Sequence, residues 1–212
     1  MDIDNIRREY QTAGLRRHDL QADPLKQFAI WFEEACARGL QDPTAMVLAT
    51  VAADGQPSQR IVLLKHFDAD GFVFFTNYQS KKAEDITHNN KVSLLFPWHY
   101  MDRQVKIAGC ASRVDQNTSR DYFLSRPRES QLAAWASRQS STISSRRFLL
   151  QQFDTMKEKF AEGKVPLPDF WGGYRVVAHS FEFWQGGASR LHDRFHYQHK
   201  NGADWEISRL AP

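Results

Sequence analysis

The chain has 212 residues, of which 42% are hydrophobic and 13% aromatic, so it can bury one sizeable core and needs no second domain. The formal net charge of +3 suits anionic small molecules as well as nucleic acid and by itself favours neither. Cys36 and Cys110 stand in no metal-binding spacing, the start of the chain lacks the apolar core of a signal peptide, and no run reaches membrane-spanning length. We therefore expect one cytoplasmic domain with free thiols, no bound metal and no membrane contact.

The first forty residues follow helical patterns. Residues 3–11 predict a short polar helix. Residues 23–40 predict a longer helix, with Asp23 as its N-cap, Pro24 at its first position and Gly39 at its end.

From Thr44 onward the chain shows short apolar or alternating runs separated by turn sequences, which is typical of antiparallel strands. A polar helix near residues 80–90 and three helices between about Asn117 and Gly163 interrupt these runs. An Asn-Gly turn at residues 201–202 joins the last two expected strands. This order of strands and helices along the chain favours an α+β protein built on a small barrel with inserted and flanking helices. The expected strands are 45–52, 58–67, 72–77, 91–100, 103–114, 174–187, 190–200 and 205–212.

The stretch "SRPRES", residues 125–130, is the most informative local site. Pro127 disfavours helix at Arg126 and suits the first position of a new helix, which places Arg126 at a helix N-terminus. The helix amides, Arg126 and the hydroxyl of Ser130 would form a phosphate pocket. Tyr122 lies four residues earlier on the same helical face and adds a phenol donor. The alternative is an ordinary turn between helices with surface arginines.

Further cations and donors occur near strand ends. In "QRIVLLKH", strict alternation points Arg60 and Lys65 to opposite faces, so a shared ligand requires twist, a bulge or contact from a strand end. A core strand with charged ends explains the pattern equally well. Other donors for an anion or a polar heterocycle follow at the start of a helix and in a loop: Lys81, Lys82, Gln139 and Ser140.

The stretch "FWQGGASRLHDRF", residues 183–195, concentrates nitrogen donors. With the chain extended from Ser189 onward, Arg190, His192 and Arg194 lie on one face. A solvated strand face is the simpler interpretation of this stretch taken alone. Because the same alternation turns His199 away from His192 and no Cys or paired carboxylate joins them, we expect no metal site there.

The sequence contains no P-loop, GxSxG, HExxH or GxGxxG motif. Instead, short stretches spread over nearly the whole chain resemble, in order, the pyridoxamine (pyridoxine) 5′-phosphate oxidase family. They are "RREY", "DPTAMVLATV", "QRIVLLKHFD", "FFTNYQSKKA", "VSLLFPWH", "RQVKIAG", "YFLSRPRESQ", "QSS", "PDFWGGYRV", "EFWQGG", "RLHDRF" and "RLAP".

The resemblance implies an FMN-binding split β-barrel over residues 1–212, working as a homodimer with cofactor sites at the subunit interface. It implies oxidation of pyridoxine 5′-phosphate and pyridoxamine 5′-phosphate to pyridoxal 5′-phosphate, with O2 as acceptor and H2O2 released, in vitamin B6 synthesis and salvage. The flavin carries the hydride chemistry, and the protein aligns two anionic ligands. Residues 1–20 are expected to form a mobile segment that covers the active site.

Family contacts transfer to this chain position by position. Lys81 stands where many members carry Arg. The ammonium of lysine is a point charge, whereas the guanidinium of arginine can bind a phosphate through two hydrogen bonds, so the effect on FMN affinity is open. Arg190 and His192 carry the expected catalytic roles at the pyridine ring. The implied substrate contacts are Arg7, Tyr10, Lys65, Tyr122, Arg126, Ser130, Arg190, Leu191 and His192. The implied FMN contacts are Arg60, Ile61, Val62, Leu63, Leu64, Lys65, Phe75, Thr76, Lys81, Lys82, Gln104, Gln139, Ser140, Trp184 and Arg194.

Two other functions compete with this one. A flavin reductase or a non-catalytic flavin protein would keep the barrel and FMN, but it leaves the group of Tyr122, Arg126 and Ser130 without a task. A nucleic-acid-binding module would use exposed arginines and aromatics, but the net charge is low and no RNP, KH or HTH signature is present, so no nucleic acid partner is expected. Arg16, Arg17 and Arg209 form either a second anion site or a solvated basic patch.

Overall fold

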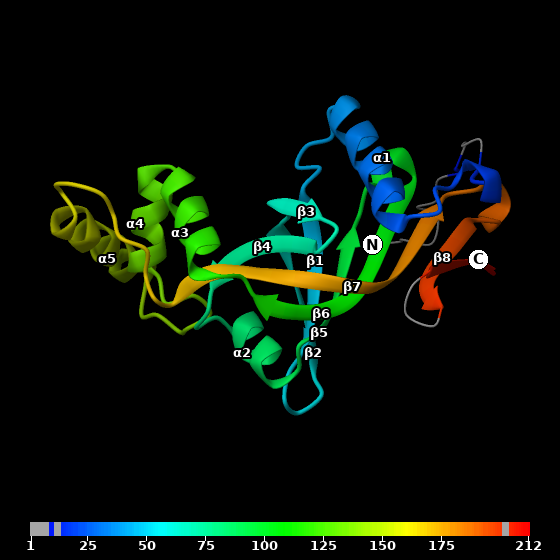
Figure 1. The fold of residues 1–212 in the computed structure, drawn as a ribbon. Helices are drawn as coiled ribbons and strands as arrows, with labels where there is room; N and C mark the ends of the chain where they lie inside the picture. The colour runs from blue at the N-terminus through cyan, green and yellow to red at the C-terminus, as the bar shows by residue number, and fades with distance from the viewer. Residues whose placement is uncertain (1–8, 11–13, 201–203) are drawn as a thin grey trace, which may run out of the picture.

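A computed structural model describes residues 9–10, 14–200 and 204–212. Its centre is one antiparallel sheet, curled into a half-barrel, in which β2-β1-β5-β6-β7-β4-β3 lie side by side and β8 and β9 continue from β7 (Figure 1). The strands are β1 Ala45–Val51, β2 Pro57–Leu63, β3 His66–Asp68, β4 Gly71–Asn77, β5 Lys91–Phe96, β6 Arg103–Arg113, β7 Trp171–Gln185, β8 Asp193–Lys200 and β9 Asp204–Leu210.

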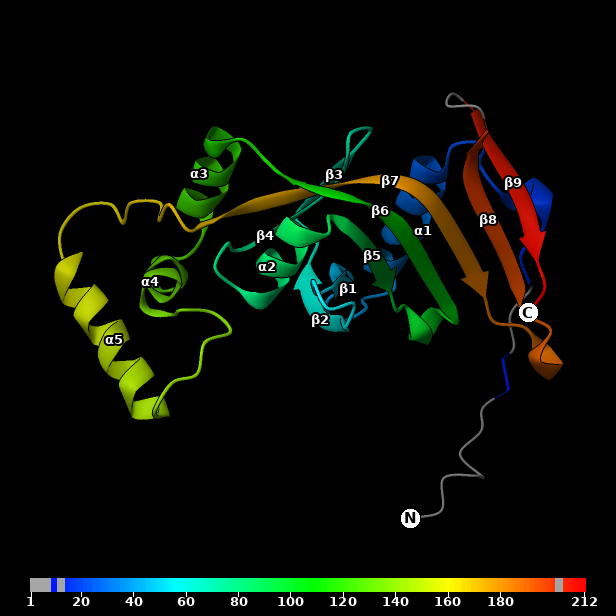
Figure 2. The same ribbon diagram turned by 90° about the horizontal axis from the view of Figure 1, so that it is seen from below.

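Five α-helices within the described residues flank this sheet. Helix α1 lies at one side of it, and α3, α4 and α5 gather at the end where β7 begins, far from β8 and β9 (Figure 2). The helices are α1 Pro24–Ala37, α2 Lys81–His88, α3 Gln116–Ser125, α4 Arg128–Ala136 and α5 Arg146–Lys159, and short 3-10 turns are η1 Arg17–Asp19, η2 His99–Met101 and η3 Ala188–Arg190. The α+β half-barrel with inserted and flanking helices is the fold class expected from the sequence.

Local sequence explains where α1 begins and what it covers. The carboxylate of Asp23 accepts a hydrogen bond from the backbone N–H of Leu25, and Pro24 occupies the first turn, as expected. Phe28 and Trp31 are buried, and the ring of Phe28 packs edge-on against Phe72 with centroids 5.0 Å apart. The helix therefore closes the main core over the concave sheet.

The strands alternate as a half-buried sheet requires. In β1 the side chains of Met46 and Leu48 are fully buried while their neighbours are half-buried, and β5 repeats this with Leu94 and Phe96. A second, smaller core beneath α3, α4 and α5 is built on Phe123, Leu132, Val165 and Trp171. The two cores lie at different ends of one continuous sheet.

The structure corrects several predicted boundaries, of which three concern the candidate site residues. Pro127 caps α4, which begins at Arg128, so Arg126 follows α3 and precedes the cap. The run predicted as one strand over 58–67 ends as β2 at Leu63 and resumes as β3. The chain is not extended from Ser189, because Ser189 and Arg190 adopt left-handed φ angles of 52° and 62° within η3.

Some predictions, near the N-terminus and at residues 201–202, fall on residues that the structure does not describe. The expected helix over 3–11 lies outside the described residues except for positions 9 and 10, which are not helical, and the turn at 201–202 lies wholly outside them. From residue 14 the chain packs on the body, since Leu15 and Leu20 belong to the main core. Whether the segment 1–20 covers the active site stays a prediction.

Candidate active site

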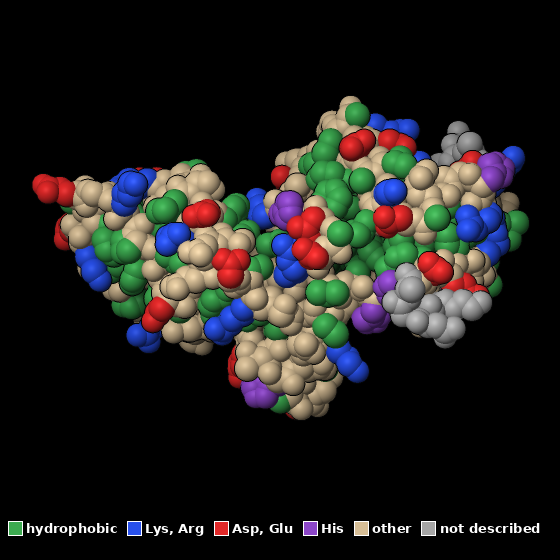
Figure 3. Space-filling model, in the orientation of Figure 1, with side chains coloured by type: hydrophobic (Ala, Val, Ile, Leu, Met, Phe, Trp, Pro, Cys, Tyr) green, Lys and Arg blue, Asp and Glu red, His purple; other side chains and the backbone are tan. Residues whose placement is uncertain are grey.

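A pocket of about 720 Å³ lies between the sheet and the α3–α4 pair. The molecular surface is visibly hollowed between the helical end and the body of the sheet (Figure 3). Strand β2, strand β4, the first turn of α2 and the α3–α4 junction all contribute. The predicted site residues that line it are Arg60, Ile61, Val62, Leu63, Lys65, Phe75, Thr76, Lys82, Tyr122, Arg126, Ser130 and Gln139.

Arg60 is held in this pocket by several acceptors. Its Nη1 donates to the carbonyl of Leu48 at 3.1 Å and to Oγ1 of Thr50 at 2.7 Å, and its Nη2 donates to Ser58 Oγ at 2.7 Å. Burial lowers the pKa of Arg60, and the charge of Asp85 partly offsets this. An arginine fixed in this way is a permanent charge with a defined direction.

Lys65 reaches the same pocket because the chain leaves the strand before it. β2 ends at Leu63, and the backbone N–H of Lys65 donates to the carbonyl of Val73 at 2.8 Å, outside the β1–β2 register. Contact from a strand end is one of the three ways in which the sequence allowed Arg60 and Lys65 to share a ligand. Leu64, between them, is buried in the main core and does not line the pocket.

Lys82 is the most desolvated cation of the pocket. Its ammonium donates to Oγ1 of Thr76 at 3.3 Å, to Oγ of Ser80 at 3.2 Å and to Oε1 of Gln139 at 2.8 Å. Burial and then the charge of Arg60 lower the pKa of Lys82 to about 8. An incoming anion would restore the preference for the charged form.

Lys81 does not line the pocket. Its ammonium lies 2.9 Å from Asp85 and 3.9 Å from Glu84 on the same helix. Asp85 is buried, and it also accepts a hydrogen bond from Thr50 Oγ1 at 2.7 Å and lies 3.9 Å from Nη2 of Arg60. Sequence reasoning missed Asp85, although its spacing of four from Lys81 was a visible helical signal.

The α3–α4 junction brings Tyr122, Arg126 and Ser130 together on one wall, as the sequence predicted. The ring of Tyr122 stacks on Phe75 with centroids 4.0 Å apart. The guanidinium carbon of Arg126 lies 4.7 Å from the ring centroid of Trp171. The Nη1 of Arg126 is buried and has no hydrogen-bond partner among the described residues. A buried donor without an acceptor indicates a place for an anion.

A second group of predicted residues lies elsewhere. The rings of Tyr10 and Trp184 pack edge-on with centroids 5.7 Å apart, and His192 lies 4.7 Å from Trp184. Nδ1 of His192 accepts the backbone N–H of Gly187 at 3.1 Å. Arg190 and Leu191 are exposed beside this group, and Gln104 is the register partner of Trp184.

Arg194 belongs to the same region. Its Nε donates to Glu182 at 2.9 Å, and its Nη1 donates to the carbonyl of Ala211 at 2.7 Å. The pKa of Arg194 is raised, chiefly by the hydrogen bond from its guanidinium to Glu182. The guanidinium is therefore fixed between β7 and the C-terminal residues.

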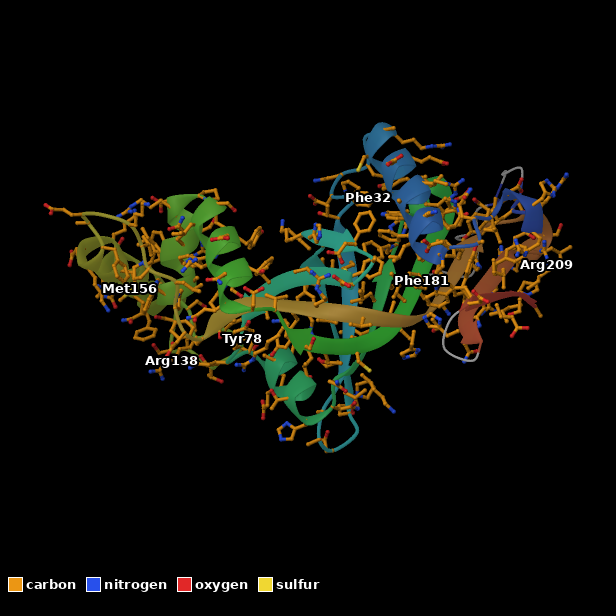
Figure 4. All side chains as sticks on the ribbon, viewed as in Figure 1. Phe32, Tyr78, Arg138, Met156, Phe181 and Arg209 are labelled. Atoms are coloured by element: carbon orange, nitrogen blue, oxygen red, sulfur yellow. The ribbon has the colours of Figure 1, made fainter. Side chains whose placement is uncertain are left out.

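One chain does not bring the two groups together. Trp171 opens β7 and lines the pocket, whereas Trp184 lies near the other end of that strand, roughly 40 Å further along it. Figure 4 shows Arg138 and Met156 at the helical end and Arg209 beyond the far end of β7. Of the remaining predicted residues, Ser140 is exposed outside the pocket lining, and Arg7 lies outside the described residues.

The part of the chain that the structure describes offers neither a metal-binding cluster nor a membrane-spanning helix. No group of three or more His, Cys, Asp or Glu side chains there is arranged to hold a metal ion, and the ring of His199 stacks on Trp205. No helix there is long and apolar enough to cross a membrane.

The sequence matches two family models that together span most of the chain. Residues 32–160 match the model described as pyridoxamine 5′-phosphate oxidase. Residues 171–212 match the model described as the pyridoxine 5′-phosphate oxidase C-terminal dimerisation region.

Curated proteins named pyridoxine/pyridoxamine 5′-phosphate oxidase are similar along their whole length. The protein from Teredinibacter turnerae is 63% identical and that from Pseudoalteromonas translucida 59% identical, each over all of both chains. Among solved structures, PhzG from Burkholderia lata in complex with tetrahydrophenazine-1-carboxylic acid superposes with a TM-score of 0.87 at 27% identity, covering 94% of this chain and 98% of that one. An FMN-binding protein from Nostoc punctiforme, 15% identical with a TM-score of 0.71 over 91% of this chain and all of its own, shares the fold.

With the fold, these matches define an oxidoreductase of the split-barrel class. Its strands supply the floor of a cation-lined pocket, and its helices supply one wall. The chain belongs to the pyridoxine/pyridoxamine 5′-phosphate oxidase family.

Proposed function

We propose that this chain is an FMN-dependent oxidase that converts pyridoxine 5′-phosphate and pyridoxamine 5′-phosphate to pyridoxal 5′-phosphate, with O2 as acceptor and H2O2 released. One observation carries the proposal: a single pocket is lined by two separate sets of anion-binding side chains. Arg60, Lys65 and Lys82 come from the sheet and α2, and Arg126 comes from the α3–α4 junction. Two sets suit two phosphorylated ligands in one pocket.

The residues present fit FMN on chemical grounds. Among the described residues, the buried ammonium of Lys82, with its pKa of about 8, donates only to neutral oxygens of Thr76, Ser80 and Gln139, so a phosphate dianion would stabilise its charge. Arg60 and Lys82 would hold that phosphate, and residues 61–63 and Phe75 would lie along the ring system. When bound, FMN supplies a ring that accepts a hydride from the substrate and passes the electrons to O2.

The protein's own residues bind and orient the substrate. The phenol of Tyr122, the free Nη1 of Arg126 and the hydroxyl of Ser130 would hold the substrate phosphate. Lys65 lines the same pocket from the connection between β2 and β3 and could serve either phosphate. This chemistry requires alignment of two ligands and no protein nucleophile.

Arg190 and His192 would address the pyridine ring, and Trp184 and Arg194 the flavin, from a second copy of the chain. All four lie between residues 171 and 212, the span that matches the dimerisation region. Since one chain keeps these side chains far from its own pocket, a homodimer in which each subunit completes its partner's site accounts for both facts. The unpaired Cys36 and Cys110 support a cytoplasmic location.

Spectroscopy and oxygen uptake test the proposal together. The purified protein should be yellow, release FMN on denaturation, and consume O2 with pyridoxine 5′-phosphate and pyridoxamine 5′-phosphate but hardly with unphosphorylated pyridoxine. Apoprotein should bind FMN much more tightly than riboflavin. Flavin reduction without activity on either phosphate would favour a reductase, and a colourless protein with salt-sensitive RNA binding would favour a nucleic-acid-binding module.

A further inference from the structure

Trp171, in the stretch "FWGG" of residues 170–173, forms part of the pocket wall but has no role in the proposed reaction so far. Its side chain is 7% exposed and belongs to the second core. Its ring lies nearly parallel to Phe75, with centroids 5.6 Å apart, and to Tyr122, with centroids 6.2 Å apart. The three rings form one stacked aromatic cluster beside the α3–α4 junction.

Arg126 lies against the rings of Trp171 and Phe123 instead of against a carboxylate. Its guanidinium carbon is 4.7 Å from the centroid of Trp171 and 5.7 Å from that of Phe123. No ion pair between Arg126 and an acidic side chain occurs among the described residues, whereas Arg103 lies 2.6 Å from Glu34 and Arg194 lies 2.9 Å from Glu182. An aromatic face holds a guanidinium in position without cancelling its charge.

The backbone after Trp171 is fixed by close contacts. A Cβ at Gly172 would lie 2.2 Å from the hydroxyl oxygen of Tyr78, and one at Gly173 would lie 2.8 Å from a ring carbon of Phe75. The Tyr78 hydroxyl donates to the carbonyl of Gly173 at 3.0 Å, and the N–H of Gly173 donates to Ser119 Oγ at 3.3 Å. The two glycines therefore let β7 approach β4 and α3 directly after Trp171, which fixes the backbone that carries the indole.

We propose that Trp171 is a positioning residue that holds Arg126 ready for the substrate phosphate and so sets the preference for phosphorylated substrates. The inference rests on the proposed function. A carboxylate in place of the indole would fix Arg126 equally well but would neutralise it, and the incoming phosphate would have to displace that partner. The indole supplies the platform, and the buried Nη1 of Arg126 keeps its hydrogen-bonding capacity for the ligand.

A double-mutant cycle tests this assignment. In the holoenzyme, Trp171→Leu should raise KM for pyridoxine 5′-phosphate roughly 5- to 30-fold and leave kcat within about twofold, as loss of a desolvated cation–π contact predicts. In an Arg126→Ala background the same substitution should change kcat/KM less than about twofold, because the group it positions is gone. Trp171→Phe keeps an aromatic face and should lie between wild type and Trp171→Leu.

Trp135 provides a matched control in the same core. Its ring packs on Phe160 and Phe170, its indole N–H donates to the carbonyl of Pro166 at 2.8 Å, and it does not line the pocket. Trp135→Leu should lower thermal stability without raising KM. If Trp171→Leu does not fold, Trp171→Phe in both backgrounds gives the same cycle with a smaller coupling.

The outcomes separate the inference from the function on which it rests. A wild-type protein that consumes no O2 with either phosphorylated substrate contradicts the proposed function. An active wild type in which the Trp171 substitutions lower kcat/KM equally with and without Arg126 contradicts the positioning role. A loss of FMN affinity at unchanged KM would assign Arg126 and Trp171 to the cofactor phosphate and overturn the inference.

Discussion

The ammonium of Lys82 lies 2.8 Å from Oε1 of Gln139, which joins the first turn of α2 to the loop after α4. The other acceptors of Lys82, on Thr76 and Ser80, are also uncharged. No carboxylate pairs with this ammonium among the described residues, so its charge is stabilised poorly until an anion arrives. The pKa of about 8 follows from that environment.

FMN affinity should therefore fall as the pH rises above about 8. Lys82 is protonated below this pH and neutral above it, and the phosphate of FMN is already a dianion throughout this range. The logarithm of the FMN dissociation constant should rise with pH, approaching one decade per pH unit once the proton must be taken up on binding. Fluorescence titration of apoprotein between pH 7 and pH 9.5 measures this slope.

Two variants isolate the contribution of Lys82 to that slope. Lys82→Arg stays protonated and should abolish most of the pH dependence. Lys82→Gln should bind FMN weakly and with little change between pH 7 and pH 9.5. An identical slope in wild type and in Lys82→Gln would assign the titration to another group.

Asp85→Asn should lower the free energy of unfolding of the apoprotein by about 1–3 kcal/mol at pH 7, because Thr50, Arg60 and Lys81 lose a charged acceptor. Burial alone raises the pKa of Asp85, but hydrogen bonds from Lys81 and Thr50 and the charges of Lys81 and Arg60 bring it below its ordinary value. The stabilisation is thus present above the unfolded-state pKa and is lost as the pH falls through the lower folded-state pKa.

Urea denaturation at pH 7 and near pH 3 tests the prediction for Asp85. The difference between wild type and Asp85→Asn should shrink at the lower pH. Glu84→Gln is the control, since Glu84 is exposed and lies 3.9 Å from Lys81, and it should cost less than about 0.5 kcal/mol. Equal losses for the two variants would show that burial of Asp85 adds nothing.

Arg190→Ala and Arg194→Ala should fail in different ways. Arg190 is exposed, and its loss should leave FMN bound while kcat/KM falls roughly 10- to 150-fold with saturating FMN, as removal of a charged hydrogen-bond partner predicts. Arg194→Ala should first lose FMN occupancy. His192→Ala should resemble Arg190→Ala, with a smaller loss if His192 only orients the ring. If both arginine variants kept wild-type FMN affinity and kcat/KM, Arg190 and Arg194 would belong to a solvated surface without a role in binding.

The FMN content of the protein should depend on formation of the dimer. Sedimentation of serially diluted protein should show a dimer that loses FMN as it dissociates, since the proposed flavin contacts come from both subunits. A monomer with full FMN occupancy at working concentration would contradict the shared site.

Local rules predicted the pocket wall at the α3–α4 junction, whereas the positions of residues 61–63, Phe75 and Thr76 came from the family resemblance. Pro127 restricts the residue before it, so the break between α3 and α4 and the placement of Arg126 beside Tyr122 and Ser130 followed from backbone sterics. The shift of Pro127 from first helical residue to cap is a difference of one position, within the uncertainty of any helix boundary.

The loop at residues 186–192 was mispredicted because alternation assumes an uninterrupted strand. A Cβ at Gly187 would lie 2.3 Å from the carbonyl oxygen of Leu191, so the chain folds back on itself there, and Ser189 and Arg190 take left-handed angles within the turn. Contacts that close such a loop leave no periodic trace in the sequence. Trp171, and the contact of Asp85 with Thr50, were missed for a related reason: the partner residues Arg126 and Thr50 are distant in the sequence, and only packing brings them close.

The length of β7 has a genetic consequence. This strand carries Trp171 into one pocket and Trp184 away from it. If the proposed shared site is correct, a defect in Arg126 and a defect in Arg190 should damage opposite halves of it. In a mixed dimer of Arg126→Ala and Arg190→Ala chains, one site carries both lesions and the other carries none. The two impaired proteins, unfolded and refolded together in equal amounts, should therefore regain about a quarter of wild-type activity, since half of the dimers are mixed and each holds one intact site. Complementation between alleles is thus expected for any pair of lesions that β7 holds apart.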